Sequence, residues 1–586
     1  MRALESGWQH RLSASTRRIN CSVQPQWILA RDFDLNGAQL PWPELCSSDC
    51  IARLLQRKRF ACADDVRRFL NPRLAALGDP FRLDGMSAVV ERLFRAIKRN
   101  ERIVLFGDYD VDGVSSLALL FEMLRAYGCQ ASLFLPHRLE EGYGLSADAI
   151  ARCLKQHAPQ LLIAVDCGTT SVSEIDTLRK AGVDVIVVDH HEPKAELPDC
   201  FLVNPKTSNS EFTYLCSVGL VFKLCHALLK TRRIDFDLKA TLELVALGTV
   251  ADIVPLHGEN RVFVKSGSAA LAQSRRRGII KLMQFAAVKP PIMPEDIGFR
   301  LGPRLNAAGR LATAEKALSL LLTDDDLEAE QLARELDAQN RERQDVEKRI
   351  LLEAEEQLTK NFDPVGSAAI VLGAKGWHPG VLGIVASRIA KKYHRPAIIV
   401  GFDESGHGKG SGRGIEGFSL IAALNQCRDT VEKFGGHEMA AGIALSEKTF
   451  PAFREQFLEA VRKQLSNDAL EPRLHLDAEI ALADVNFDLL HWHEQLQPFG
   501  NGNPQPVFVS CEIEPAAPPR LVGERHLALR LKQGNWHQRG IFFDGMASPL
   551  PPPPWDVAYR ICSDIYEGET RIQLQVQALR SAAAFD

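Results

Sequence analysis

The chain lacks any uncharged apolar stretch of about 18 residues, the length that a membrane-spanning helix requires, so the sequence excludes an integral membrane protein. Its N-terminal segment also lacks the apolar core of a secretion signal, and we therefore expect a cytoplasmic location. The 13 cysteines contain no C-x-x-C pair, and the closest two, Cys46 and Cys50, have no second half-site for zinc nearby. We expect reduced thiols, as is usual in the cytosol.

An excess of positive charge is absent as well, because the net charge is −4 at pH 7 and the pI is about 6.5. A protein that coats duplex DNA without specificity is basic overall, so this class is disfavoured. An enzyme whose basic channel surrounds an acidic metal site is compatible with this net charge. The composition is otherwise that of a globular protein, and 586 residues at roughly 150 per domain indicate about four domains.

Short apolar β runs alternate with helical segments from about residue 86, which is the pattern of an α/β protein with a doubly wound parallel sheet. The strand candidates are 103–106, 132–135, 161–165 and 183–188. A second α/β unit begins near residue 368, and the last hundred residues read as the short strands of a small β-barrel. We expect an N-terminal helical extension over 1–80, then an α/β domain over 81–320, a long connecting helix over 321–360, a smaller α/β domain over 361–465 and the barrel over 466–586.

The connecting segment is charge-rich and free of glycine and proline over residues 324–360. At about 1.5 Å per residue such a helix spans roughly 50 Å. A polar helix of this length usually bridges domains across solvent. A coiled coil is the alternative, but the apolar positions do not keep a heptad.

Three carboxylates, Asp108, Asp110 and Asp112, fall within five residues directly after a β run. They repel one another by about 1 kcal/mol per pair even in water, so bound cations are the expected compensation. An EF-hand loop begins in the same way, but its twelfth position here is Leu119 in place of a bidentate Glu, and a helix does not precede it. We therefore expect a metal site at the end of a strand.

The same layout recurs twice, since the next β runs end in Asp166 and in Asp189-His190-His191, and Asp252 follows an apolar helical segment. One Asp after a strand is usually a helix N-cap, so the argument depends on the clusters jointly. The carboxyl ends of parallel strands share the edge at which such folds bind ligands. Asp and His without Cys suit Mn²⁺ or Mg²⁺, and so many ligands suit two ions about 3.5–4 Å apart, the arrangement that hydrolyses phosphate esters.

Ordered motifs along the chain resemble those of the DHH phosphoesterase superfamily, and within it the RecJ family of bacterial single-stranded-DNA exonucleases. The motifs are GDYDVDG at 107–113, DCG at 166–168, DHH at 189–191, GTVADIVPL at 248–256, GPRLNAAGRL at 302–311, GSGRG at 410–414 and FGGHEMAAG at 434–442. Departures from the family pattern are small and remove no charged ligand. The resemblance implies a parallel-sheet DHH domain, a smaller α/β DHHA1 domain joined to it by the long helix, and a C-terminal barrel of the oligonucleotide-binding (OB) type.

The resemblance also implies the activity and its residues. The expected reaction is two-metal hydrolysis of single-stranded DNA in the 5′→3′ direction, with release of 5′-mononucleotides, in recombination and repair. The implied ligands of two Mn²⁺ or Mg²⁺ ions are Asp110, Asp112, Asp166, His190 and Asp252, with Asp108 and His191 beside the ions as further catalytic residues. A single-strand-binding protein and a repair helicase are the implied partners, and we expect a monomer.

Candidate substrate-binding residues are Arg138, Arg304, Asn306, Arg310, Ser411, Arg413 and His437. Glycines alternate around Lys409 and Arg413, and glycine lets backbone amides approach an anion, although a plain flexible loop has the same composition. Arg304 and Arg310 flank Asn306 and suit bidentate contacts with phosphate, or are solvated helix charges. Arg138 is a weaker candidate for gripping a 5′ phosphate.

Three further features have two interpretations each. The basic run at 274–278 is interpreted either as a contact with a DNA backbone or as solvated surface charge. Trp536 and His537 are interpreted either as side chains that stack on bases or, for the tryptophan, as core filler. His491 and His493 are expected to be an exposed pair in preference to metal ligands. The rival functions are a DHH phosphodiesterase of cyclic dinucleotides or short oligonucleotides, and a DNA-binding scaffold without catalysis. The residues after the second motif block favour a polymeric substrate, and the retained ligands favour an enzyme.

Overall fold

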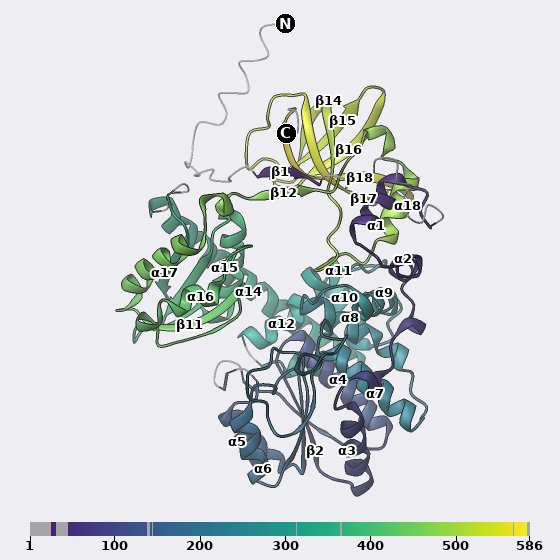
Figure 1. Cartoon of the computed structure of the whole chain (residues 1–586), viewed down its shortest axis with the longest axis vertical. Helices are drawn as coiled ribbons and strands as arrows, with labels where there is room; N and C mark the ends of the chain where they lie inside the picture. The colour runs from purple at the N-terminus through teal and green to yellow at the C-terminus, as the bar shows by residue number, and fades with distance from the viewer. Residues whose placement is uncertain are drawn as a thin grey trace.

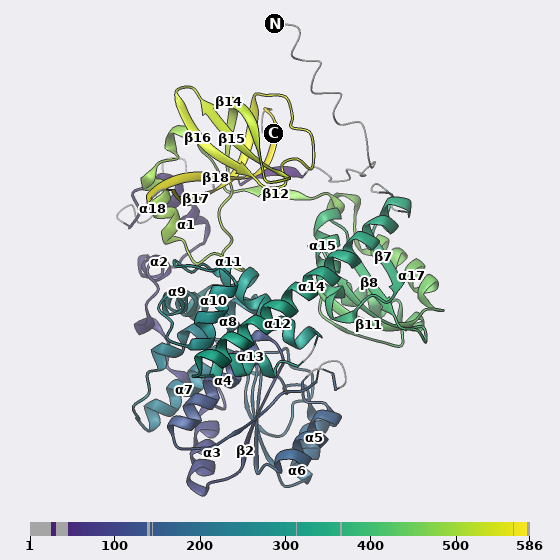
Figure 2. The ribbon, with the colours of Figure 1, turned by 180° about the vertical axis from the view of Figure 1, so that it is seen from behind.

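The computed structural model describes residues 25–30, 45–137, 141–142, 144–311, 313–361, 363, 366–566 and 568–582, and Arg138 lies outside them. The chain forms three bodies, which Figures 1 and 2 show from opposite sides: a large α/β body, a smaller α/β body at the far end of helix α14, and a β-barrel. The smaller body and the barrel each lie beside the large body, which carries the order of β runs and helices expected from the sequence.

The large body is built on five parallel strands in the order β3-β2-β4-β5-β6. Their bounds are β2 Ile103–Gly107, β3 Ser132–Phe134, β4 Leu161–Val165, β5 Asp184–Val188 and β6 Phe201–Val203. Strands β2 and β4 are buried along their whole length, as continuous apolar runs in a sheet covered on both faces should be. One face packs on α3 (Met86–Arg99), α4 (Val111–Ala126) and α7 (Ser217–Thr231), and the other on α5 (Ala147–His157) and α6 (Val172–Lys180).

A helical layer completes this body and leads into the connection. It consists of α8 (Leu242–Ala251), α9 (Gly258–Ala272), α10 (Arg277–Phe285), α12 (Gly302–Leu311) and α13 (Glu315–Leu322). Helix α14 (Asp326–Asn361) buries Leu336 in the large core and Ile350 in the core of the smaller body. The long polar helix is therefore packed at both ends, and it is less exposed than its composition indicates.

Among the described residues, no helix has both the length and the apolar character that a membrane span needs.

Halfway along α14, ionic contacts fix the smaller body to the helix. Glu347 pairs with Arg343 at 2.8 Å and with Arg388 of α15 (Pro379–Tyr393) at 2.6 Å, and Arg343 also donates to the side-chain oxygen of Asn340 at 3.0 Å. Glu347, Arg343 and Asn340 are all buried. Within this set, Glu347 is the member that reaches the smaller body, through Arg388, whose side chain is 59% exposed.

The smaller body is a mixed sheet in the order β10-β11-β9-β8-β7. Its strands are β7 Ile370–Lys375, β8 Ala397–Phe402, β9 His407–Arg413, β10 Lys433–Gly436 and β11 Ala440–Ser446, covered by α15, α16 (Leu420–Asn425) and α17 (Phe450–Gln464). Strands β7 and β8 are parallel, and the rest are antiparallel.

The third body is a five-stranded barrel closed by pairing of β14 with β17. Its strands are β14 Phe508–Val522, β15 His526–Gln533, β16 Trp536–Phe542, β17 Trp555–Tyr566 and β18 Glu569–Ser581, with α18 (Phe487–Gln495) beside them. Helices α1 (Asp49–Arg57) and α2 (Ala63–Leu70) share the core of the barrel, and β1 (Gln26–Leu29) pairs with β12 (Arg473–Leu476). The described elements of the expected N-terminal extension up to Leu70 are thus joined to the C-terminal body, whereas Leu74 and Leu77 pack on the core of the large body.

Candidate metal centre

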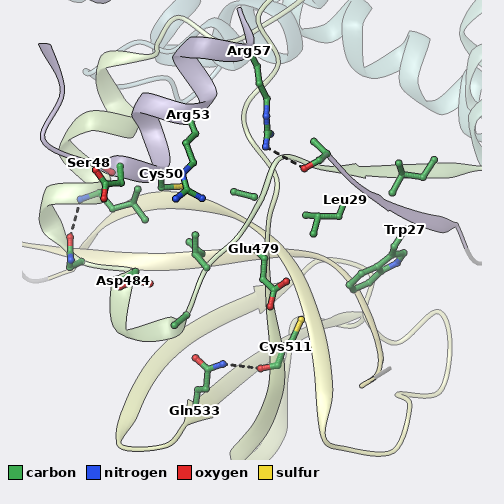
Figure 3. A pocket seen from close by; sticks show the side chains of 18 of the residues that line it. Trp27, Leu29, Ser48, Cys50, Arg53, Arg57, Glu479, Asp484, Cys511 and Gln533 are labelled. Atoms are coloured by element: carbon green, nitrogen blue, oxygen red, sulfur yellow. Dashed lines mark hydrogen bonds between the residues drawn. The ribbon is translucent and has the colours of Figure 1, made fainter. Parts of the chain in front are cut away.

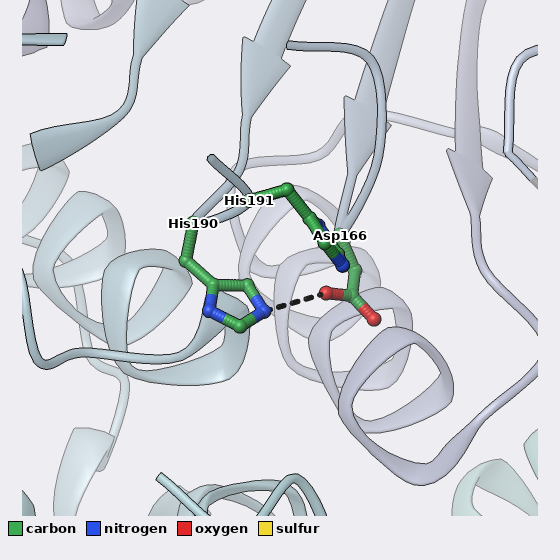
Figure 4. A group of neighbouring side chains, drawn as sticks. All are labelled: Asp166, His190 and His191. Atoms are coloured by element: carbon green, nitrogen blue, oxygen red, sulfur yellow. Dashed lines mark ion pairs between the residues drawn. The ribbon is translucent and has the colours of Figure 1, made fainter. Parts of the chain in front are cut away.

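Acidic and imidazole side chains gather where β2, β4 and β5 end, at one edge of the large sheet (Figure 4). Asp108 and Asp110 follow β2, Asp166 follows β4, and His190 follows β5. Asp166 adopts a left-handed backbone conformation with φ 62°, a region in which Asp is one of the few tolerated residues. The parallel register thus brings side chains from distant parts of the sequence to one place.

The donor atoms form three overlapping groups, each with all atoms within 4.8 Å of one another. The groups are Asp108–Asp110–Asp166, Asp112–His190–Asp252 and Asp166–His190–His191. The structure therefore brings together all seven residues that the sequence analysis named as catalytic. His190 lies between two groups, because its Nε2 is 3.5 Å from Asp166 Oδ1 and 3.5 Å from Asp252 Oδ2.

Asp112 is fixed from behind by the first turn of α7. The amides of Ser217 and Val218 donate to its two carboxylate oxygens at 2.7 and 2.8 Å. Free amides at a helix N-terminus are suited to an anion. Gly248 of α8 completes the fit, since a Cβ there would lie 2.8 Å from Asp112 Oδ1. Its place in the sequence motif thus has a packing cause.

The loop that carries Asp110 is held on both sides. Asp110 caps α4 by accepting a hydrogen bond from the amide of Gly113 at 3.0 Å, and the side-chain oxygen of Asn306 accepts from the amide of Val111 at 3.1 Å. Glycine is required at 113, where a Cβ would lie 2.5 Å from the carbonyl oxygen of Asp108. Asn306, on α12, therefore supports the acidic loop directly.

Asp189 organises the turn that carries the two histidines, a role that the sequence analysis did not assign. Its Oδ1 accepts from the amide of His190 at 2.8 Å and lies 2.7 Å from His191 Nδ1, and its Oδ2 accepts from the amide of Thr169 at 3.0 Å. Burial alone would raise the pKa of Asp189, but the hydrogen bond and charge of His191 outweigh burial and hold this pKa below its usual range. The same contact outweighs burial at His191 and raises its pKa to about 9.

The electrostatics of the cluster fit divalent cations. Burial and then the charges of neighbouring carboxylates raise the pKa of Asp112 to about 7 and of Asp252 to about 8, and raise that of Asp166 well above its usual range. Burial lowers the pKa of His190 to about 3, so its imidazole is neutral and can act as a ligand. Several buried carboxylates that repel one another are more negative charge than one imidazolium offsets, and hard divalent ions such as Mn²⁺ or Mg²⁺ would compensate the remainder.

The predicted substrate residues lie in two places. Arg304 pairs with Asp337 of α14 at 2.9 Å, and only the backbone of Arg310 is described. Ser411 and Arg413 lie on β9 of the smaller body, where Arg413 donates to the hydroxyl of Ser411 at 3.0 Å. His437 is exposed at the turn between β10 and β11. Their contacts with a substrate stay predictions.

The alternating glycines of β9 have a structural cause that differs from the interpretation given above. A Cβ at Gly408, Gly410 or Gly412 would lie within 2.9 Å of a core side chain, namely Phe402, Ile443 and Leu420 respectively. These glycines make room for the core. Because side chains alternate along a strand, Lys409, Ser411 and Arg413 share the opposite face.

Three other sequence features are now placed. Arg276 of the basic run is half-buried and pairs with Glu122 and Glu243 inside the large body, so this member of the run is structural. His491 is exposed, but His493 is only 2% exposed, so the expectation of an exposed pair was wrong for His493. Trp536 is 58% exposed on the barrel, which disagrees with a role as core filler.

A cavity of about 1390 Å³ lies far from this chemistry, between β1, α1 and the barrel (Figure 3). Its lining mixes Arg53 and Arg57 with Glu479 and Asp484, and it contains none of the residues of the acidic cluster. The cluster is therefore the candidate site because of its chemistry, and cavity size does not reveal it.

Comparison with known proteins agrees with this layout. Residues 102–249 match the DHH family, N-terminal domain, residues 366–467 the DHHA1 domain, and residues 476–578 the RecJ OB domain. The single-stranded-DNA-specific exonuclease RecJ of Dickeya dadantii is 36% identical over 575 residues, which cover 92% of this chain and 98% of that protein. RecJ of Bacillus subtilis is 38% identical over 461 residues, 78% of this chain, and the chain spans 58% of that longer relative.

Solved structures show the same similarity to RecJ as the sequence comparisons. RecJ from Thermus thermophilus in complex with Mn²⁺ aligns with a TM-score of 0.82 and 31% identity, over 96% of this chain and 80% of that one. The same protein in complex with Mg²⁺ aligns with a TM-score of 0.76. The predicted fold class, with its DHH, DHHA1 and OB domains, is confirmed. By sequence, domain order and fold, the chain belongs to the RecJ family of single-stranded-DNA-specific exonucleases.

Proposed function

We propose that the chain hydrolyses single-stranded DNA from the 5′ end with the help of two divalent ions, Mn²⁺ or Mg²⁺, and releases 5′-mononucleotides in recombination and repair. The observation that carries this proposal is the meeting of seven acidic and imidazole side chains at one sheet edge, in a chain with the domains of RecJ. Two ions bound there supply Lewis acidity and a water of lowered pKa, which are what phosphodiester hydrolysis needs.

The residues that would hold the ions are Asp110, Asp112, Asp166, His190 and Asp252. Asp166 and His190 each take part in two of the overlapping donor groups, so both ions depend on them. Asp108 completes the group next to β2. The rigid anchoring of Asp112 by α7 keeps the site formed before substrate arrives, which avoids reorganisation during the reaction.

His191 has the properties of a phosphate contact. Its side chain is 36% exposed at the rim of the cluster, and its contact with Asp189 raises its pKa to about 9 in the metal-free protein. Asp189 fixes the ring by its contact with Nδ1. A charge-assisted hydrogen bond from this imidazolium would hold a phosphate oxygen beside the ions.

Ser411 and Arg413 of the DHHA1 domain are the proposed grip on the DNA backbone, together with Arg138, Arg304, Asn306, Arg310 and His437. We place the strand between the DHH and DHHA1 bodies, which α14 holds at a set separation (Figure 2). Selectivity for single strands is then steric, because a duplex is wider than one strand. The exposed Trp536 of the OB domain suits stacking with a base further along.

A single-strand-binding protein and a repair helicase as partners, a monomeric state and a cytoplasmic location also belong to this proposal. They rest on the family resemblance.

The proposal is tested with a 5′-labelled single strand, the same sequence as a blunt duplex, and a dinucleotide, each with Mn²⁺. We expect labelled mononucleotide from the single strand first, and at least about a hundredfold slower release from the duplex. Heat-denatured duplex is the matched control and should be digested like the single strand. Equal rates on the duplex would contradict the steric account, and faster turnover of the dinucleotide would favour a phosphodiesterase of short oligonucleotides.

A further inference from the structure

A loop between α18 and the barrel contacts the turn that follows Asp252. The side-chain amide of Asn501 donates to the carbonyl of Ile253 at 2.7 Å, and the amide of Leu256 donates to the carbonyl of Asn501 at 2.7 Å. One residue of the C-terminal body thus makes two bonds to a four-residue turn of the DHH domain. The two segments are 248 positions apart in the sequence.

The turn needs such support because its backbone is strained. Ile253 has φ 58°, a conformation that is a genuine outlier for a β-branched residue, and its side chain is 70% exposed. Strain of this kind persists only where the surroundings over-determine it. Asn501 holds the carbonyl of the strained residue and, through Leu256, the far end of the turn.

The contact is closely fitted on both sides of Asn501. A Cβ at Gly500 would lie 2.7 Å from Leu256 Cδ1, and one at Gly502 would lie 3.0 Å from Pro255 Cβ. Gly502 also has φ 71°, which other residues adopt with strain. Two glycines around one asparagine therefore allow the loop to lie directly on the turn.

The loop itself is anchored to the DHH domain. Arg261 of α9 is 2% exposed and donates to the carbonyls of Gln495, Leu496, Gln497 and Pro498 at 2.6 to 3.3 Å. Asn503 donates to the carbonyl of Leu496 at 2.9 Å and accepts from Lys58 Nζ at 2.8 Å. Arg261 thereby fixes the loop to α9, and Asn260 of the same helix fixes the turn by donating to the carbonyl of Pro255 at 3.0 Å. The Lys58 contact comes from the end of α1 and is not part of this anchor.

Asp252 has more need of this support than Asp112 has. The Asp112 carboxylate is held by two amides and is 1% exposed, whereas the Asp252 side chain is 25% exposed. The described contact of the Asp252 carboxylate is with His190, itself a proposed ligand. The direction of the Asp252 carboxylate therefore depends on the backbone that carries it, at the end of α8.

We propose that Asn501 is a positioning residue for Asp252, so that the loop before the OB barrel sets the geometry of one metal ligand. This inference rests on the proposed metal-dependent function. The barrel side of the molecule then has a second role beside contact with DNA: it tunes how tightly one of the two ions is held.

The test is the Mn²⁺ affinity of metal-free full-length protein, measured by titration calorimetry, with bound ions counted by electron paramagnetic resonance. Asn501→Ala and the isosteric Asn501→Asp both remove the donor to Ile253. We expect about tenfold weaker binding of one ion in each, as for other residues that orient metal ligands, and unchanged binding of the other. Hydrogen exchange of the amides at 253–256 should become faster.

Lys58→Met is the matched control, because it removes a loop contact that does not touch the turn. It should lower thermal stability about as much as Asn501→Ala and leave both Mn²⁺ affinities unchanged. Wild-type affinities in both Asn501 variants, together with loss of one ion in Asp252→Ala, would overturn the inference and leave the metal centre intact. Two ions bound normally by Asp252→Ala would instead refute the metal-centre assignment itself.

Discussion

The DHH and DHHA1 bodies handle charge in opposite ways. At the sheet edge of the DHH domain, carboxylates crowd together in buried positions and raise one another's pKa values. On β9 of the DHHA1 domain, cationic and hydroxyl side chains share the face toward α15, with Lys409 exposed and Arg413 partly buried, and the glycines make room for the core on the other face. We expect the first region to require cations before it meets a phosphate, and the second to meet a phosphate directly. The proposed chemistry thus lies in the DHH body alone, whereas the proposed grip draws on both bodies.

The substitution that should separate catalysis from DNA binding most clearly is Asp166→Ala. Asp166 belongs to two donor groups, so its loss should lower kcat by more than about a thousandfold in a Mn²⁺-dependent nuclease assay. Binding of single-stranded DNA, followed by fluorescence anisotropy, should remain within about threefold of wild type, because the proposed DNA-gripping side chains are other residues. Asp176→Ala, on the exposed side of α6, is the control and should behave as wild type. Retained cleavage by Asp166→Ala would overturn the site.

The pH dependence of Mn²⁺ binding tests the buried carboxylates of the DHH domain. Asp112 and Asp252, with pKa values of about 7 and 8, are largely protonated in the metal-free protein at pH 6, and a bound ion must displace those protons. The Mn²⁺ dissociation constant should therefore fall about tenfold per proton displaced for each pH unit between 6 and 8, and level off above 8. Calorimetry in buffers of different ionisation enthalpy checks the proton release.

The same pKa values determine whether these carboxyls stabilise or destabilise the folded protein as pH rises. An unfolded Asp titrates near 3.9, so between about pH 4 and the folded pKa values of about 7 and 8 Asp112 and Asp252 bind more protons in the folded metal-free protein than in the unfolded chain. The contribution of these two carboxyls to the free energy of unfolding should decrease as pH rises through that window, and saturating Mn²⁺ should remove this decrease. A dissociation constant that does not change from pH 6 to 8 would contradict the whole account.

The smallest expected effect comes from a substitution on β9 of the DHHA1 domain. Arg413→Gln shortens the side chain and removes its charge and guanidinium donors, and we expect the KM for single-stranded DNA to rise about tenfold with kcat changed less than threefold. Mn²⁺ affinity should stay at the wild-type value. Lys409→Gln, at an exposed position on the same face of β9, serves as control for loss of charge alone. An unchanged KM in Arg413→Gln would remove this arginine from the grip.

Local pattern predicted much of this architecture. The apolar runs ending at Phe106, Val165 and Val188 became buried parallel strands, and the shared edge of such a sheet was enough to predict that Asp166 and His190 would meet. The family was also predictable, because its motifs are ordered along the chain. In these cases the signal lies in consecutive residues, or in the one rule that the carboxyl ends of parallel strands coincide.

Other features depend on tertiary packing and left little local signal. The burial of His493 follows from its contact with Phe499 and Phe508, and the glycines of β9 make room for side chains of neighbouring elements. The role of Asn501 depends on a turn 248 residues away. The run of Gly500, Asn501 and Gly502 was the available hint, since two glycines around a polar residue indicate a close backbone approach.

The shared core of α1, α2 and the barrel has a consequence for how the protein is made. Ser47 donates a hydrogen bond to Asp488, 441 positions later, and Trp492 donates to Ser47. A ribosome adds about 5–20 residues per second, so the barrel that covers the apolar sides of α1 and α2 is synthesised about 20–90 s after these helices. During that interval they are exposed while the DHH domain folds, which makes them natural places for a chaperone to bind the nascent chain.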